Sequence, residues 1–157
     1  MSKYAILQNR IVKDLVSIGV PVSFELIIKD YSKSFYGCYR PNTDRVYLYY
    51  YEDKECSTPY SYEHLFKIAV HESVHAIQWN DPDFVRVKGV MHNEDFHRMF
   101  EHYMCLAKEL VFREKTKDDV EEVHVVPVIN FKGRSVYSNT GDVARPYNSV
   151  LRVACRR

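Results

Sequence analysis

Three residues that could do chemistry together stand close in the chain: His71, Glu72 and His75. Side chains four residues apart lie on one face of a helix, so the two histidines can present their ring nitrogens to one metal ion. Zinc bound in this way lowers the pKa of a water ligand, and Glu72 lies where it can take the proton as a general base. The same carboxyl can then protonate a leaving amine. The pattern predicts a zinc-dependent hydrolase, with peptide bonds as the first interpretation of its substrate.

This pattern is short, and its specificity depends on context. In a chain of this composition it should arise by chance on the order of 0.02 times. Leu65, Ala69 and Ala76 recur around it at a spacing that indicates a partly buried helix. The alternative is a pair of histidines that only pack on or cap that helix.

A catalytic zinc site needs a third protein ligand and one open position. The candidates downstream are His92, Glu94, His97, Glu101 and His102. On a helix of about 100° per residue, His92 falls about 50° from the centre of the apolar stripe and His97 about 90°. The other three fall about 130° or more away on the same count. We therefore expect His92 as the third ligand, with His97 as the second choice. The favoured alternative for both His97 and His102 is an exposed position on the helix flank.

The elements around these residues predict an α+β, zincin-like domain. In it, a small antiparallel or mixed sheet packs on an active-site helix and on a second long helix. The expected elements are a helix over Lys3–Ile18, a strand over Val22–Ile28, a hairpin of Ser34–Arg40 and Arg45–Tyr51, a helix from a Thr58 cap to about Trp79, and a helix from His92 or Asn93 to about Lys115.

The end of the chain is expected to add strands to the same domain. Residues 1–157 are taken as one domain, with 118–157 as its β-rich C-terminal extension. Strands are expected over Val123–Phe131, Ser135–Ser138 and Val150–Ala154. The chain's 157 residues and 46% apolar content suit one globular unit with a sizeable core.

Charge is nearly balanced, at a formal net charge of +1, which supplies no general argument for nucleic acid binding. Basic residues nevertheless gather near the C-terminus. They are Lys132, Arg134, Arg145, Arg152, Arg156 and Arg157. This stretch is a candidate DNA contact, and its alternative is a solvated end.

The four cysteines, Cys38, Cys56, Cys105 and Cys155, form no CxxC pair. No secretory signal or membrane-length apolar run is evident. We therefore expect reduced thiols in a cytoplasmic or nuclear protein that is not secreted and has no membrane partner.

The segments His71-Glu72-Ser73-Val74-His75 and His92-Asn93-Glu94-Asp95-Phe96 together resemble the SprT-like metallopeptidases. That family shows HExxH followed by a third histidine in an HGxxF-like segment. Here His92 and Phe96 match, and Asn93 stands where glycine is usual. The resemblance covers roughly Tyr4 to Lys115. The paired cysteines of the C-terminal zinc ribbon found in many members are absent from this sequence.

The resemblance implies zinc as cofactor, His71, His75 and His92 as its ligands, and Glu72 as catalytic base. It also implies proteins or peptides as substrates, among them proteins bound or crosslinked to DNA, as in DNA–protein crosslink repair.

Two features of the catalytic site stay open at this level. The oxyanion of a tetrahedral intermediate needs a further hydrogen-bond donor, and the candidates are Tyr36, Tyr39, Tyr103 and Tyr137. An extended peptide substrate needs a strand edge, and Arg45–Tyr51 is the candidate. The alternative for this strand is an interior position with its tyrosines packed on helices.

Three functions are compatible with these residues. The first is a zinc endopeptidase, the second a non-proteolytic zinc-containing binding module that contacts nucleic acid, and the third a zinc hydrolase of amides other than peptides. The intact Glu72 favours the two enzymes, because a binding module has no use for a carboxyl group at that position.

Overall fold

The computed structural model describes residues 3–113, 128–129 and 135–136. Along the chain they form α1 (Ala5–Ser17), β1 (Glu25–Lys29), β2 (Gly37–Arg40), β3 (Arg45–Tyr49), α2 (Tyr62–Asn80) and α3 (Glu94–Leu110), followed by the short strands β4 (Val128–Ile129) and β5 (Ser135–Val136). The expected α+β class is confirmed. Each expected helix and each strand of the hairpin is present, most of them shorter at one or both ends than the sequence pattern indicated.

The sheet has the order β1-β3-β2, with β3 in the centre. β1 pairs with β3 in parallel, and β2 pairs with β3 in the antiparallel sense, with Tyr39 opposite Val46. The prediction that Arg45–Tyr51 forms the substrate-binding edge is therefore wrong. β3 is paired on both sides, and its residues 46–49 are buried, as the alternative of an interior strand required. The edge of the sheet beside α2 belongs to β2.

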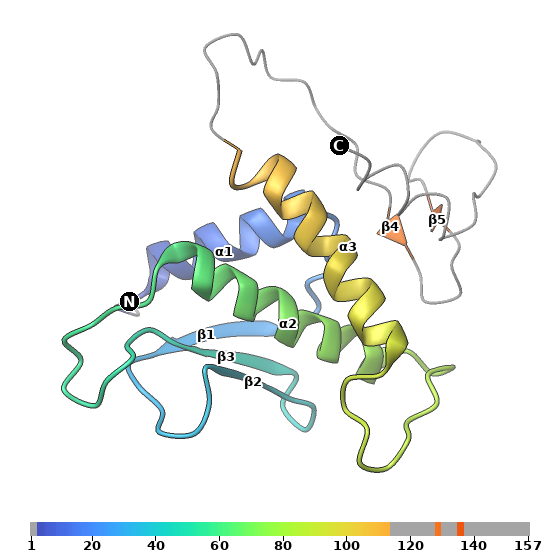
Figure 1. Cartoon of the computed structure of the whole chain (residues 1–157), viewed down its shortest axis with the longest axis horizontal. Coiled ribbons are helices and arrows are strands. Elements are labelled where there is room, and N and C mark those ends of the chain that lie inside the picture. The colour runs from blue at the N-terminus through green and yellow to red at the C-terminus, as the bar shows by residue number, and fades with distance from the viewer. Residues whose placement is uncertain (1–2, 114–127, 130–134, 137–157) are drawn as a thin grey trace, which may run out of the picture.

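The three helices lie on one side of this sheet (Figure 1). Side chains that face inward from the sheet and from all three helices form one core. Its most buried large members include Ile11, Leu15, Leu48, Phe66 and Phe96. Because α2 contacts both β2 and β3, this core holds the helix with the HExxH pattern directly against the sheet.

The start of α2 differs from expectation. Thr58 and Pro59 were expected to begin the helix, but Ser61 is the N-cap, and its side chain accepts a hydrogen bond from the His64 N–H at 3.2 Å. Residues 58–60 stay extended because they pair with the chain that follows β3. The Glu52 N–H donates to the Thr58 carbonyl, and the Tyr60 N–H donates to the Tyr50 carbonyl. Serine caps helices as well as threonine does, and this pairing decides between them.

The buried face of α3 is rotated from its expected direction. It includes Met99, His102 and Leu106, which lie on one side of the apolar stripe inferred from the sequence. In the folded protein His102 is turned inward, where its side chain is 2% exposed. The expectation of an exposed His102 is wrong, whereas His97 is exposed as expected.

Val128–Ile129 pairs with Ser135–Val136 in the antiparallel sense, which agrees with two of the late strands expected. The basic C-terminal residues, Tyr137, Cys155 and the expected strand at 150–154 lie outside the described residues. Within the described residues, no helix has the length and apolar character needed to cross a bilayer.

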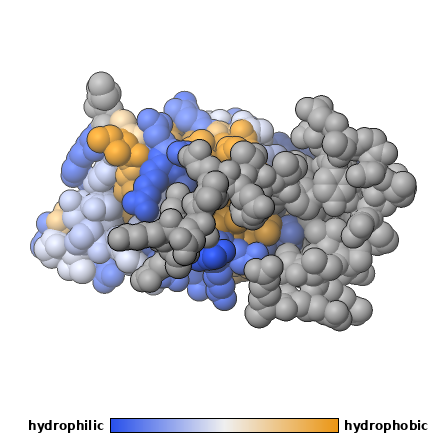
Figure 2. All heavy atoms as spheres, turned by 90° about the horizontal axis from the view of Figure 1, so that it is seen from above, coloured by the Kyte–Doolittle hydropathy of each residue, from blue (hydrophilic) through white to orange (hydrophobic). Residues whose placement is uncertain are grey.

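The surface of the described residues mixes polar and apolar areas (Figure 2). Among the exposed large apolar side chains are Ile6 on α1 and Val85 and Met91 in the segment between α2 and α3. Scattered exposure of this kind is normal for a folded domain.

Candidate metal centre

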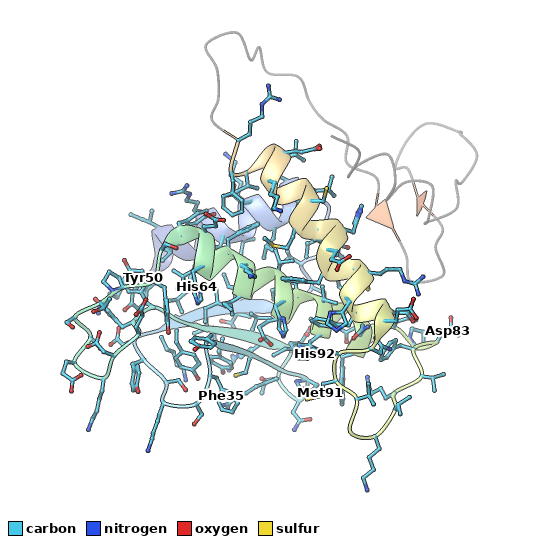
Figure 3. The ribbon with its side chains drawn as sticks, viewed as in Figure 1. Phe35, Tyr50, His64, Asp83, Met91 and His92 are labelled. Atoms are coloured by element: carbon cyan, nitrogen blue, oxygen red, sulfur yellow. The ribbon has the colours of Figure 1, made fainter. Side chains whose placement is uncertain are left out.

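Two elements bring three histidines together. α2 presents His71 and His75 one turn apart, and His92 comes from the chain just before α3, on the side of α2 (Figure 3). Nε2 of His92 lies 3.1 Å from Nε2 of His75 and 3.1 Å from Nε2 of His71. One ligating atom from each of the three lies within 4.8 Å of the others. The residues that the sequence pattern selected as metal ligands thus converge on one point.

The spacing of these nitrogens fits a zinc ion. Zinc–nitrogen bonds of 2.0–2.1 Å in a tetrahedral site place the ligand nitrogens about 3.3 Å apart, close to the two separations of 3.1 Å. His71 and His75 are half-buried and His92 is exposed. The group therefore combines three protein ligands with access from solvent, which a catalytic zinc site requires.

The protonation of the rings also favours a cation. Burial, together with the neighbouring His92 and His97, lowers the pKa of His71 to about 4. Burial, together with His71 and His92, lowers the pKa of His75 to about 4. Both rings are therefore neutral at neutral pH, and each keeps a lone pair for a metal.

Phe96 forms the apolar support of the three histidines. Its side chain is 2% exposed, and its ring centroid lies 4.8, 4.6 and 4.5 Å from those of His71, His75 and His92. A ring packed against all three imidazoles limits their rotation and excludes water from one side of the site.

Glu72 points from α2 to the edge strand. Its Oε2 accepts a 2.8 Å hydrogen bond from the backbone N–H of Tyr39 in β2. Burial raises the pKa of Glu72 to about 7, while this hydrogen bond favours the ionised form. A carboxyl group that titrates near neutral pH is suited to accept and release a proton during a reaction.

The remaining candidates for a third ligand do not join the group within the described part of the chain. His97 is exposed, and its ring centroid lies 6.3 Å from that of His92. Glu94 forms an ion pair with Arg98 on the surface of α3, and Glu101 is exposed. His102 is buried beside Tyr103.

The candidate tyrosines have other contacts. The Tyr39 hydroxyl donates to Asp44 at 2.9 Å, and the Tyr36 ring packs edge-on against Tyr60 and His64. Tyr103 is buried at 3% exposure. The fourth candidate, Tyr137, lies outside the described residues.

Two contributions to the site were not found from the sequence. The Tyr39 N–H carries no signal in the sequence, because any residue has this group and only the strand arrangement aims it at Glu72. The capping role of Asn93, in contrast, could have been recognised from the sequence. Asn93 is the N-cap of α3 and precedes two acidic residues, which is a known pattern of helix starts. His92 therefore lies in the turn before the helix and not in its first turn.

No family model, curated protein or solved structure matches this chain.

Proposed function

We propose that the chain is a zinc-dependent endopeptidase in which His71, His75 and His92 bind the metal and Glu72 is the general base. The observation that supports this most is the convergence of three imidazole nitrogens beside a buried carboxyl group. A purely structural zinc site is closed by four protein ligands, whereas three ligands with an exposed side are typical of catalytic sites.

When bound, zinc supplies Lewis acidity and makes hydroxide available near neutral pH. Glu72 takes up the proton that the attacking water loses and delivers it to the amine nitrogen of the leaving group. The Tyr39 N–H holds the carboxyl group in place for both steps. Phe96 keeps the imidazoles in a fixed arrangement throughout.

β2 is the element best placed to bind an extended substrate. It lies at the edge of the sheet, and its Tyr39 N–H faces outward to Glu72. A peptide that pairs with this edge lies next to the base and to the histidines. Main-chain pairing of this kind provides affinity with little dependence on side chains.

The proposal is tested with the full-length chain loaded with zinc and an unfolded protein as substrate. Glu72→Gln is the matched variant, because glutamine retains the shape and a hydrogen-bond acceptor for the Tyr39 N–H but cannot act as a base. Wild type should cleave, and the variant should lose at least about a hundredfold in rate, with equal zinc content and an unchanged circular dichroism spectrum. Absence of cleavage by zinc-loaded wild type, or equal rates for both proteins, would contradict the proposal.

The resemblance to SprT-like metallopeptidases extends the proposal to substrates that are associated with DNA. The same assay with a DNA-binding protein, in the presence and absence of DNA, tests this extension. Faster cleavage with DNA is the expected result, and an equal rate in both conditions would remove DNA from the proposal without affecting the peptidase assignment.

A further inference from the structure

The third histidine is the member of the metal centre whose position depends most on tertiary structure. His71 and His75 share one helix and keep their separation as long as α2 is intact. His92 follows His75 by 17 residues, at the other end of the connection between α2 and α3. Something must hold the start of α3 against α2 if the three nitrogens are to stay together.

One oxygen atom joins these two helices. Oδ1 of Asn93, next to His92, accepts a 2.8 Å hydrogen bond from the Phe96 N–H as the cap of α3. The same oxygen accepts a 3.3 Å hydrogen bond from Nε2 of Gln78. Gln78 lies on α2 one turn after His75 and is 4% exposed. This hydrogen bond joins two residues that closely follow proposed metal ligands in the chain: Gln78 follows His75, and Asn93 follows His92.

We propose that Gln78 is a positioning residue for the metal centre and that Gln78 acts on His92 through the side chain of Asn93. A buried amide is costly unless its hydrogen bonds are made, so its bond to Asn93 favours one placement of the turn that carries His92. The same turn sets Phe96 against the three imidazoles. This inference rests on the proposed metal centre and not on peptide hydrolysis.

The test measures zinc affinity of the full-length chain by competition with a chelator. Gln78→Met removes the donor and keeps the length of the side chain, and Asn93→Asp retains an acceptor for both hydrogen bonds. We expect Gln78→Met to weaken zinc binding about tenfold, as is common when a group that orients a ligand is lost. Asn93→Asp should show no such loss, because its carboxylate keeps both hydrogen bonds and its charge attracts a nearby cation. The unfolding of the metal-free protein, followed in parallel, should change little in either variant.

A double-mutant cycle with Asn93→Ala separates positioning from general packing. If Gln78 acts through Asn93, adding Gln78→Met to Asn93→Ala should cause no further loss of affinity. Should Gln78→Met fail to fold, Asn93→Ser can replace it as the test of this hydrogen bond. Serine still caps the helix but is too short to reach Gln78. Asn93→Ser should show the same tenfold loss.

Two results would overturn the inference. One is wild-type zinc affinity in either Gln78→Met or Asn93→Ser. The other is full additivity of the losses in zinc affinity caused by Gln78→Met and Asn93→Ala in the double-mutant cycle. Wild type that binds no zinc would overturn the metal centre itself. Normal zinc binding without proteolysis would overturn only the proposed reaction.

Discussion

The backbone N–H of Tyr39 on β2 lies 2.8 Å from Oε2 of Glu72 on α2. This bond connects the edge of the sheet to the carboxyl group at the centre of the HExxH pattern. It requires β2 to approach α2 closely, and the residue that permits the approach is Gly37. A Cβ at position 37 would lie 2.5 Å from Cγ2 of Ile68 and 3.2 Å from Cγ of Glu72.

Gly37→Ala should therefore push β2 away from α2. We expect a loss of about 1–3 kcal/mol in the free energy of unfolding, typical of overpacking, and a lower rate of the proposed peptide hydrolysis because Glu72 loses its hydrogen-bond partner. Denaturant unfolding measures the first effect. Ile68→Leu, which removes the nearest methyl group, should relieve part of the strain. If the effects of Gly37→Ala and Ile68→Leu on the free energy of unfolding add in full in the double variant, the predicted clash does not limit stability.

Alanine substitutions of His92 and His97 should show which of these two histidines is the third zinc ligand. His92→Ala should lower zinc affinity by more than about tenfold, because loss of a proposed ligand should cost more than loss of an orienting group. His97→Ala should bind zinc nearly as wild type does, because His97 lies outside the converging group. Zinc competition titrations of the two variants decide the matter. Loss of zinc from His97→Ala with retention in His92→Ala would reverse the assignment.

The cap of α2 can be tested by a matched pair of alanine substitutions. Ser61→Ala removes the side-chain acceptor for the His64 N–H and should cost about 1 kcal/mol of stability. Thr58→Ala alters the residue that the sequence pattern favoured as the cap, and it should cost less than about 0.5 kcal/mol. Urea unfolding of the metal-free proteins is the measurement. A larger loss for Thr58→Ala would place the cap where the sequence pattern put it.

His102 should make the protein sensitive to acid. Burial lowers the pKa of His102 from 6.5 to about 4, so the unfolded chain binds a proton at this residue at higher pH than the folded chain does. Above about pH 6.5 the titration of His102 has no effect on the free energy of unfolding. As the pH drops from there to about 4, the free energy of unfolding falls. The loss attributable to this residue should reach at most about 3 kcal/mol.

His102→Gln removes this titration, and urea unfolding of the metal-free protein between pH 7 and 4 compares it with wild type. The difference between the two proteins isolates His102, because His71 and His75 titrate in both. Parallel stability curves over this range would show that His102 does not contribute to the acid sensitivity.

Much of the candidate site could be predicted from the sequence because it is local. His71, Glu72 and His75 lie within five residues, and the periodicity of a helix alone places the two imidazoles on one face. His92 was ranked first among five candidates, and its ring nitrogen lies beside those of His71 and His75, although the helix assumed for the ranking begins after it, at Glu94. The α+β class followed from element types that are visible in the pattern of apolar residues.

Contacts between distant segments decided the rest. Whether Arg45–Tyr49 is an edge or a central strand depends on which strands pair with it, and β1 and β2 both do. The pairing of residues 58–60 moved the cap of α2 to Ser61. Tertiary packing around α3 buried His102.

The sequence by itself determined the donor atoms of this protein's candidate centre, since residue types and short-range spacing need no tertiary contact. Only the tertiary structure decided that His92 meets the other two histidines, that Tyr39 holds Glu72, and that β2 forms the edge beside them. Each of these depends on the packing of segments far apart in the chain, and local propensities carry no information about which distant segments will pack together.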